Sequence, residues 1–566
     1  MEKIFLIIIA LISGSISSPA QAGTVTITNQ YPSPVGIYNR LRLMPSALLT
    51  GPCDIGSFYV PAALNIIYYC KDGTDYIPLS SPWAQTGTYV HLVDPDNNVG
   101  IGTQTPEFKL SLGEGANADG GILAKGVFGA GANLTTPGDG TRFIWYQKKA
   151  ALRVGGVDGD QWNDANIGNY SIGLGFNNKI ISTYSNIAGG RNNQIFVPLI
   201  YNGNPLDGHA NIGGGAENII YEGGRQATIS GGTNNIIGAS GNMFSGMSAT
   251  IGGGSDNKAR GIGSTIAGGI NNEAGDITIL WDLAAFVGAG RTNKARAVDS
   301  VIGGGSFNTI EVTSQQSFIG GGSNNLIGTY RSTIAGGTNN RIEANATDSF
   351  IGGGNNNRAW GSLSTIGGGQ NNVTGISGDP SKIQNTVGGG FDNQAAGIAS
   401  FIGGGAGNRS TAQASTVAGG NSNQATGTNS TVAGGSTNIA SGNNSMSQGG
   451  TNNTAAGDYS SASGQNMVLD PAADRTFIWG HSASAIPPVA TSDAFIIYSG
   501  NVGIGTTKPD QKLQVAGAVK LEPPTNTPPC NASNHLGTLY VSSNGGLCFC
   551  NFAQTWENIS SKGICP

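Results

Sequence analysis

A fifteen-residue phrase of mostly Gly, Asn, Ser and Thr returns along most of this chain, as in STVAGGNSNQATGTNSTVAGG from Ser415 to Gly435. Alignment gives seventeen copies that begin between residues 171 and 446. The second position is Ile or Val in every copy but the last, which has Ser447, while the fifth is always Gly and the eighth always Asn. Longer copies carry their additions after the Asn and before the next Ile or Val. Insertions confined to one part of a repeat are typical of a solenoid, where they form loops on one side.

The composition of one copy predicts how its coil is built. No 3.6-residue period runs through the copies, which excludes helix for this region. We expect the Ile or Val, from Ile172 onward, to point inward from a short strand and to stack on its counterparts in neighbouring coils. The Gly run supplies the turn. The Asn is expected to hydrogen-bond to the same Asn of the next coil, which forms a ladder. We place in this ladder Asn178, Asn193, Asn308, Asn393, Asn408, Asn423, Asn438 and Asn453.

The sequence therefore predicts an all-β protein, with a parallel β-roll or solenoid of about seventeen 15-residue repeats. Each coil offers one large apolar residue and one or two small ones. Burial of a Val or Ile contributes roughly 1.5–3 kcal/mol, whereas ordering each residue costs about 1–2 kcal/mol of backbone entropy. We therefore expect several chains to bundle and bury a second face.

The segments outside the repeats suggest export and a modular organisation. Residues 1–22 resemble a secretory signal peptide, with an apolar run of nine residues followed by AQA. The phrase NVGIGT occurs before and after the repeats. We divide the rest of the chain into an N-terminal Cys-containing β module, an NVGIGT connector, the repeat region, a cap with the second connector, and a C-terminal disulfide module. Their predicted bounds are 23–90, 91–140, 141–464, 465–521 and 522–566.

All six cysteines lie outside the repeats, and in an exported chain they indicate disulfides. The segments around Cys53 and Cys70 match those around Cys530 and Cys550, and both read as a small meander. The pairs that we expect are Cys53–Cys70, Cys530–Cys550 and Cys548–Cys565. Four cysteines allow three pairings, and links between chains stay open. We also expect Cys548 and Cys550 to face opposite sides of their strand.

The Ile/Val–Gly and Ala–x–Gly pattern of residues 141–464 resembles the head repeats of YadA-like trimeric autotransporter adhesins. NVGIGTQTPEFKLSLGEG, from Asn98 to Gly115, and its copy from Asn501 to Val519 resemble segments of trimeric tail fibres. The resemblance implies a left-handed β-roll, three of which pack as a homotrimer. The sequence departs from the family in its GGG runs and its invariant Asn, and the membrane anchor of that family is not found in it.

Signals for catalysis or for cofactor or metal binding are absent from the sequence. The net charge of −5, without a basic cluster, argues against a nucleic-acid partner. No HExxH, CxxC or GxSxG spacing occurs. Asp158, Asp160 and Asp164 crowd near Trp162, where a turn that caps the first coil is favoured over a catalytic site. Exposed aromatics at the ends of the repeats, namely Phe143, Trp145, Phe477 and Trp479, are interpreted as further end caps.

The sequence thus predicts an exported bacterial fibre protein, extracellular or on the cell surface. It would be a homotrimer with an adhesin-like head that binds a host or environmental surface, protein or glycan, without catalysis and without a cofactor. Binding is expected in the insertion loops 196–210 and 242–249. Two alternatives stay open, a single-chain solenoid that acts on polysaccharide and a purely structural spacer.

Overall fold

The computed structural model describes residues 122–521, except 136–137, 197–199, 202–203, 206–207 and 277–283, and short segments within 54–112 and 530–559. The predicted signal peptide, residues 1–22, lies outside the described residues. The chain divides into two compact units, Met1–Leu123 and Ala124–Pro566, which are taken separately below. Helix in the described part is limited to two 3₁₀ turns, η1 (Gln147–Lys149) and η2 (Asp164–Asn166). No helix in the described part is long and apolar enough to cross a membrane.

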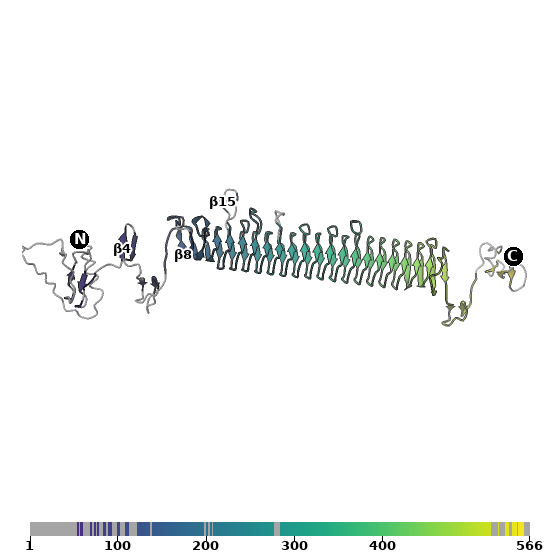
Figure 1. Cartoon of the computed structure of the whole chain (residues 1–566). Coiled ribbons are helices and arrows are strands. Elements are labelled where there is room, and N and C mark those ends of the chain that lie inside the picture. The colour runs from purple at the N-terminus through teal and green to yellow at the C-terminus, as the bar shows by residue number, and fades with distance from the viewer. Residues whose placement is uncertain are drawn as a thin grey trace, which may run out of the picture. The chain divides into compact units, whose positions relative to one another are not determined.

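A parallel β-solenoid makes up most of the second unit, as the repeats predict (Figure 1). Its first sheet has 22 strands, all paired in parallel except β8 with β9, which are antiparallel. At a strand spacing of about 4.8 Å, this sheet extends for roughly 100 Å. In chain order its strands are β8 (Gly140–Tyr146), β9 (Ala151–Val157), β10 (Ile172–Phe176), β12 (Asn186–Ile187), β16 (Asn211–Ile212), β18 (Thr228–Ile229), β20 (Thr250–Ile251), β22 (Thr265–Ile266), β24 (Phe286–Val287), β26 (Val301–Ile302), β28 (Phe318–Ile319), β30 (Thr333–Ile334), β32 (Phe350–Ile351), β34 (Thr365–Ile366), β36 (Thr386–Val387), β38 (Phe401–Ile402), β40 (Thr416–Val417), β42 (Thr431–Val432), β44 (Met446–Thr451), β46 (Ser461–Gln465), β48 (Phe477–His481) and β49 (Phe495–Ile497).

The second sheet has 18 parallel strands, which alternate along the chain with those of the first. They are β11 (Lys179–Ile180), β13 (Gln194–Ile195), β17 (Ile219–Ile220), β19 (Ile236–Ile237), β21 (Lys258–Ala259), β23 (Glu273–Ala274), β25 (Lys294–Ala295), β27 (Thr309–Ile310), β29 (Leu326–Ile327), β31 (Arg341–Ile342), β33 (Arg358–Ala359), β35 (Val373–Thr374), β37 (Gln394–Ala395), β39 (Arg409–Ser410), β41 (Gln424–Ala425), β43 (Ile439–Ala440), β45 (Thr454–Ala455) and β47 (Val468–Leu469). The insertion loop 196–210 adds a small hairpin, β14 (Ile200–Tyr201) with β15 (Asn204–Pro205).

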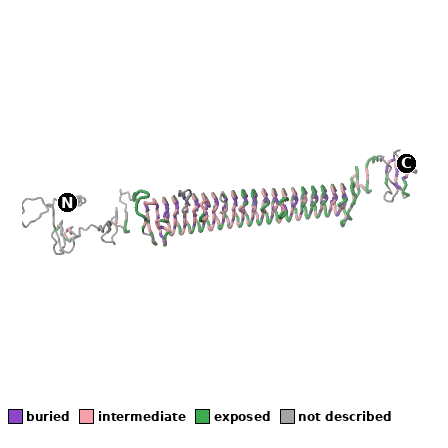
Figure 2. The backbone as a smooth tube through the Cα atoms, turned by 90° about the horizontal axis from the view of Figure 1, so that it is seen from above, coloured by how far each residue is buried: buried purple, intermediate pink, exposed green. Residues whose placement is uncertain are grey.

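The core lies between the two sheets and repeats once per coil. The second residue of each two-residue strand points inward, so Ile319 of β28 and Ile327 of β29 are both fully buried. The preceding residue points outward on either sheet. Figure 2 shows buried residues recurring in coil after coil. Many coils thus bury two large apolar residues within a single chain, where the sequence argument assumed one.

The first copy departs from the predicted pattern. Ile172 was expected to point inward, but its side chain is 44% exposed, and Gly173 pairs with Ile187 in the inward column instead. The prediction is wrong here because Arg153, from outside the repeats, fills the space beside Gly173. A Cβ on Gly173 would lie only 3.1 Å from the Cδ of Arg153. The buried guanidinium donates to the carbonyl oxygen of Ser171 at 3.0 Å, and burial lowers the pKa of Arg153 to about 10.

The two NVGIGT segments fold alike. β6 (Val99–Ile101) pairs in parallel with β7 (Leu110–Leu112), and β50 (Val502–Ile504) pairs in parallel with β51 (Leu513–Val515). The two matching sequences thus give the same local structure.

The two cysteine segments also fold alike, each as a three-stranded antiparallel meander. In the first unit the strands are β1 (Phe58–Tyr59), β2 (Tyr68–Cys70) and β3 (Tyr76–Pro78), beside a separate hairpin of β4 (Trp83–Thr86) and β5 (Tyr89–Leu92). In the second unit they are β52 (Leu539–Val541), β53 (Leu547–Cys550) and β54 (Trp556–Asn558).

The C-terminal meander buries both cysteines of β53. Cys548 and Cys550 lie in one small core with Tyr540 and Trp556. The expectation that Cys548 and Cys550 face opposite sides is wrong, because residues two apart on a strand share a face.

Candidate functional site

The Asn column of the repeats is buried in every copy and links successive coils. The Nδ2 of Asn357 donates to the carbonyl oxygens of Gly353 at 2.8 Å and Gly369 at 3.0 Å. Its Oδ1 accepts the backbone N–H of Asn372 at 2.9 Å, and its own N–H donates to Oδ1 of Asn340 at 3.0 Å. Corresponding bonds, each from the next coil to the side-chain oxygen, occur at Asn178, Asn193, Asn308, Asn393, Asn408, Asn423, Asn438 and Asn453. The column joins the coils and presents no side chain to a ligand.

Of the predicted disulfides, Cys530–Cys550 is present, with a Cα–Cα distance of 5.6 Å. Cys70 and Cys548 are also disulfide-bonded. Their expected partners, Cys53 and Cys565, lie outside the described residues.

The carboxylates near Trp162 surround an end cap. Trp162 is buried, and its indole N–H donates to the carbonyl oxygen of Asn178 at 3.0 Å. Asp164 accepts the hydroxyl of Tyr146 and lies 3.7 Å from the Nζ of Lys149. These contacts fix the chain at the start of the solenoid and support the structural interpretation. Among the residues that the structure describes, no three His, Cys, Asp or Glu side chains are grouped to hold a metal ion.

The outer face of the first sheet is apolar. Between β10 and β46 none of its strand residues is charged. Phe318 and Phe350 are 42% and 41% exposed, and their rings lie 3.4 Å from where a Cβ would stand on Gly320 and Gly352. The exposed large side chains on this face are Phe143, Trp145, Ile172, Phe286, Phe318, Phe350, Phe401, Met446, Trp479 and Phe495.

This face includes most of the aromatics that were interpreted as end caps. Phe143 and Trp145 are 73% and 46% exposed, and Trp479 is 45% exposed. They extend the outer face of the first sheet and do not seal the ends of the core, so the cap interpretation is wrong for these three residues. Trp162 alone among the predicted aromatics is fully buried at an end.

The outer face of the second sheet is charged. Glu273 lies 3.5 Å from Arg260 and 3.6 Å from Arg296, which link three coils. Its charged residues, on the strands or directly after them, are Lys179, Lys258, Arg260, Glu273, Lys294, Arg296, Glu311, Arg341, Glu343, Arg358 and Arg409. The two sheets therefore present opposite chemistry to their surroundings.

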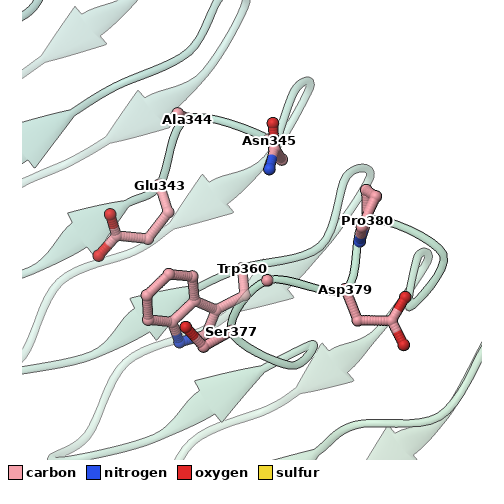
Figure 3. A pocket seen from close by; sticks show the side chains of 8 residues that line it. Glu343, Ala344, Asn345, Trp360, Ser377, Asp379 and Pro380 are labelled. Atoms are coloured by element: carbon pink, nitrogen blue, oxygen red, sulfur yellow. The ribbon is translucent and has the colours of Figure 1, made fainter.

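A hollow of about 310 Å³ opens beside the second sheet (Figure 3). It lies between the turn after β31, residues 343–345, and the loop after β35, residues 377–380, with Trp360 from the coil between them. Glu343, Asn345, Ser377 and Asp379 supply its polar groups.

The charges around the hollow are already paired. Oε1 of Glu343 lies 3.1 Å from Nε of Arg341 and 2.9 Å from Nε of Arg358. The Asp379 carboxylate accepts the hydroxyl and the backbone N–H of Ser381, and these hydrogen bonds lower the pKa of Asp379. A carboxyl whose pKa is lowered is unsuited to general-acid catalysis near neutral pH. These carboxylates are suited to accept hydrogen bonds from a ligand.

No family model matches the sequence, and no curated protein matches it significantly. The candidate site is therefore interpreted from its own geometry.

The sequence analysis placed binding in other loops. Much of loop 196–210 lies outside the described residues, and in loop 242–249 the side chain of Asn242 accepts the backbone N–H groups of Phe244 and Ser245. One signal of the hollow was present in the sequence. A copy of 15 residues, starting at Phe350, stands between copies of 17 and 21 residues.

Proposed function

We propose that this protein is an exported, non-catalytic fibre, a homotrimer that binds host or environmental surfaces through loops on its solenoid. The observation that supports self-association is the outer face of the first sheet. It is uncharged over most of its length and carries ten exposed large apolar side chains, an arrangement that marks an interaction surface in soluble proteins.

The size of this face is sufficient for a stable interface. A face roughly 100 Å long and about 10 Å wide covers around 1,000 Å², and specific interfaces bury about 800 Å² per partner. A second copy of the same chain offers the same flat apolar face. Three copies, the number implied by the resemblance to trimeric adhesins, would also multiply weak contacts made by the loops.

The test is the molar mass of the oxidised, purified protein, measured by light scattering on a sizing column. We expect a mass near three chains for the natural protein. Replacing Phe318→Asp and Phe350→Asp together is expected to shift the mass toward one chain, because two carboxylates per chain would lose water in the interface. The circular dichroism should not change, since both rings are outside the core.

A matched control places the same charges on the other sheet. Thr309→Asp with Leu326→Asp changes two outward positions of β27 and β29 and is expected to keep the trimer mass. A mass of one chain for the natural protein, or equal dissociation by both double variants, would contradict the proposed interface. Adhesion is tested separately, by binding of the protein to cells with and without loop 242–249. Unchanged binding after this deletion would place adhesion elsewhere on the fibre.

A further inference from the structure

We propose that the hollow around Trp360 binds one neutral pyranose ring of a glycan chain. This inference rests on the proposed adhesive function and names the ligand class of one site. It starts from the lengths of three consecutive coils. The coil that carries Trp360 has 15 residues, whereas its neighbours have 17 and 21, so two protruding loops stand on either side of a shorter turn.

The width of the resulting slot suits a flat ring. Coils are spaced by about 4.8 Å, so the slot that a missing loop leaves is about one coil thick. A pyranose ring is a slab of similar thickness, with polar edges and an apolar C–H face. A bulkier globular ligand would have to displace the loops 343–345 and 377–380.

Trp360 supplies the apolar surface of the slot. Its ring is held in place by Arg358, whose guanidinium lies 4.9 Å from the ring centroid. Arg358 does not line the hollow, so the hollow meets parts of the indole that Arg358 does not cover. The C–H face of a sugar can pack against an indole in this way, while its hydroxyls turn toward the walls.

The walls supply hydrogen-bonding groups of both kinds. The carboxylates of Glu343 and Asp379 accept hydrogen bonds, the amide of Asn345 both donates and accepts, and so does the hydroxyl of Ser377. Ring hydroxyls, which also donate and accept, match this set. A few polar groups around an apolar surface are typical of small-molecule sites.

The charge pattern favours a neutral sugar over an anionic one. Glu343 is already paired with two arginines, and Asp379 lies 3.8 Å from the Nζ of Lys382. A sulfate or carboxylate on the ligand would approach two carboxylates whose cations are already engaged. A neutral ring requires no new counter-ion.

The experiment measures binding of the full-length protein to cello-, chito-, malto-, manno- and xylohexaose by isothermal titration calorimetry. We expect at least one of these neutral hexaoses to bind, and heparin hexasaccharide not to bind. Trp360→Ala should weaken this binding at least tenfold. Glu343→Gln should weaken it three- to tenfold, because it keeps the shape of the wall but removes the charge that organises two arginines.

Trp479→Ala is the matched control, since Trp479 is an exposed tryptophan of the same solenoid outside the hollow. It should leave saccharide binding unchanged. Equal loss in W360A and W479A, binding of heparin alone, or no binding of any hexaose would overturn the site. If cell adhesion and trimer mass persist in that case, only the glycan site fails. If both are absent as well, the proposed function fails with it.

Discussion

Replacing Gly322 with alanine is expected to disrupt the solenoid locally, whereas replacing its neighbour Gly321 with alanine is expected to leave it intact. Gly322 has a φ of +85°, and a Cβ there would lie 2.0 Å from the carbonyl oxygen of Gly337 in the next coil. A Cβ on Gly321 would meet nothing within 4 Å. The left-handed backbone alone costs roughly 1–2 kcal/mol for a residue with a Cβ.

The clash adds to this cost because the atom that must move is backbone. Gly337 belongs to a stack of coils in fixed register, and each coil contacts its neighbours. We expect G322A to lower the free energy of unfolding by at least about 3 kcal/mol and G321A by less than about 1 kcal/mol. Denaturant unfolding followed by circular dichroism, at one fixed protein concentration, measures both. Coincident unfolding curves for G322A and G321A would contradict this explanation of the invariant fifth position.

Asn357→Ala is the second substitution with a large expected effect. It removes two N–H···O bonds to Gly353 and Gly369 and the acceptor for the backbone N–H of Asn372. Each buried polar group left without a partner costs about 1–3 kcal/mol. We therefore expect a loss of about 3–5 kcal/mol in the free energy of unfolding.

Asn355→Ala, two residues earlier in the same coil, is the control for this substitution. The Asn355 side chain is exposed, so its loss should change stability by less than about 0.5 kcal/mol. Hydrogen exchange read by mass spectrometry should locate the faster exchange of N357A in its own coil and the two adjoining coils. Uniform faster exchange along the whole solenoid would argue that the Asn column acts through global stability and not from coil to coil.

The repeats made the solenoid predictable because each copy meets near-identical neighbours. A column of Ile, Gly or Asn in the sequence becomes a column in space when the register is constant. The prediction failed at Ile172, where the register changes within one strand. Ile172 pairs with Asn186, fourteen residues on, while Phe176 bridges Arg191, fifteen residues on. The cause lies in Arg153, outside the repeats, which the pattern within the copies did not contain.

The hollow could not be predicted in the same way. Its polar residues come from two insertions that have no counterpart in other copies, so no periodic argument positions them. The copy lengths indicated where loops protrude, but the paths of residues 343–345 and 377–380 depend on local turns. One such turn is made by the Asp379 side chain, which accepts two hydrogen bonds from Ser381.

The constant spacing of the coils also turns copy number into a measure of distance. Because insertions stay on one side, deleting one whole fifteen-residue copy removes one step of about 4.8 Å and leaves both outer faces in phase. Duplication of a copy adds the same step. A lineage that carries this phrase can therefore change how far the two ends of the solenoid stand apart, one increment at a time, without altering the core that holds it together.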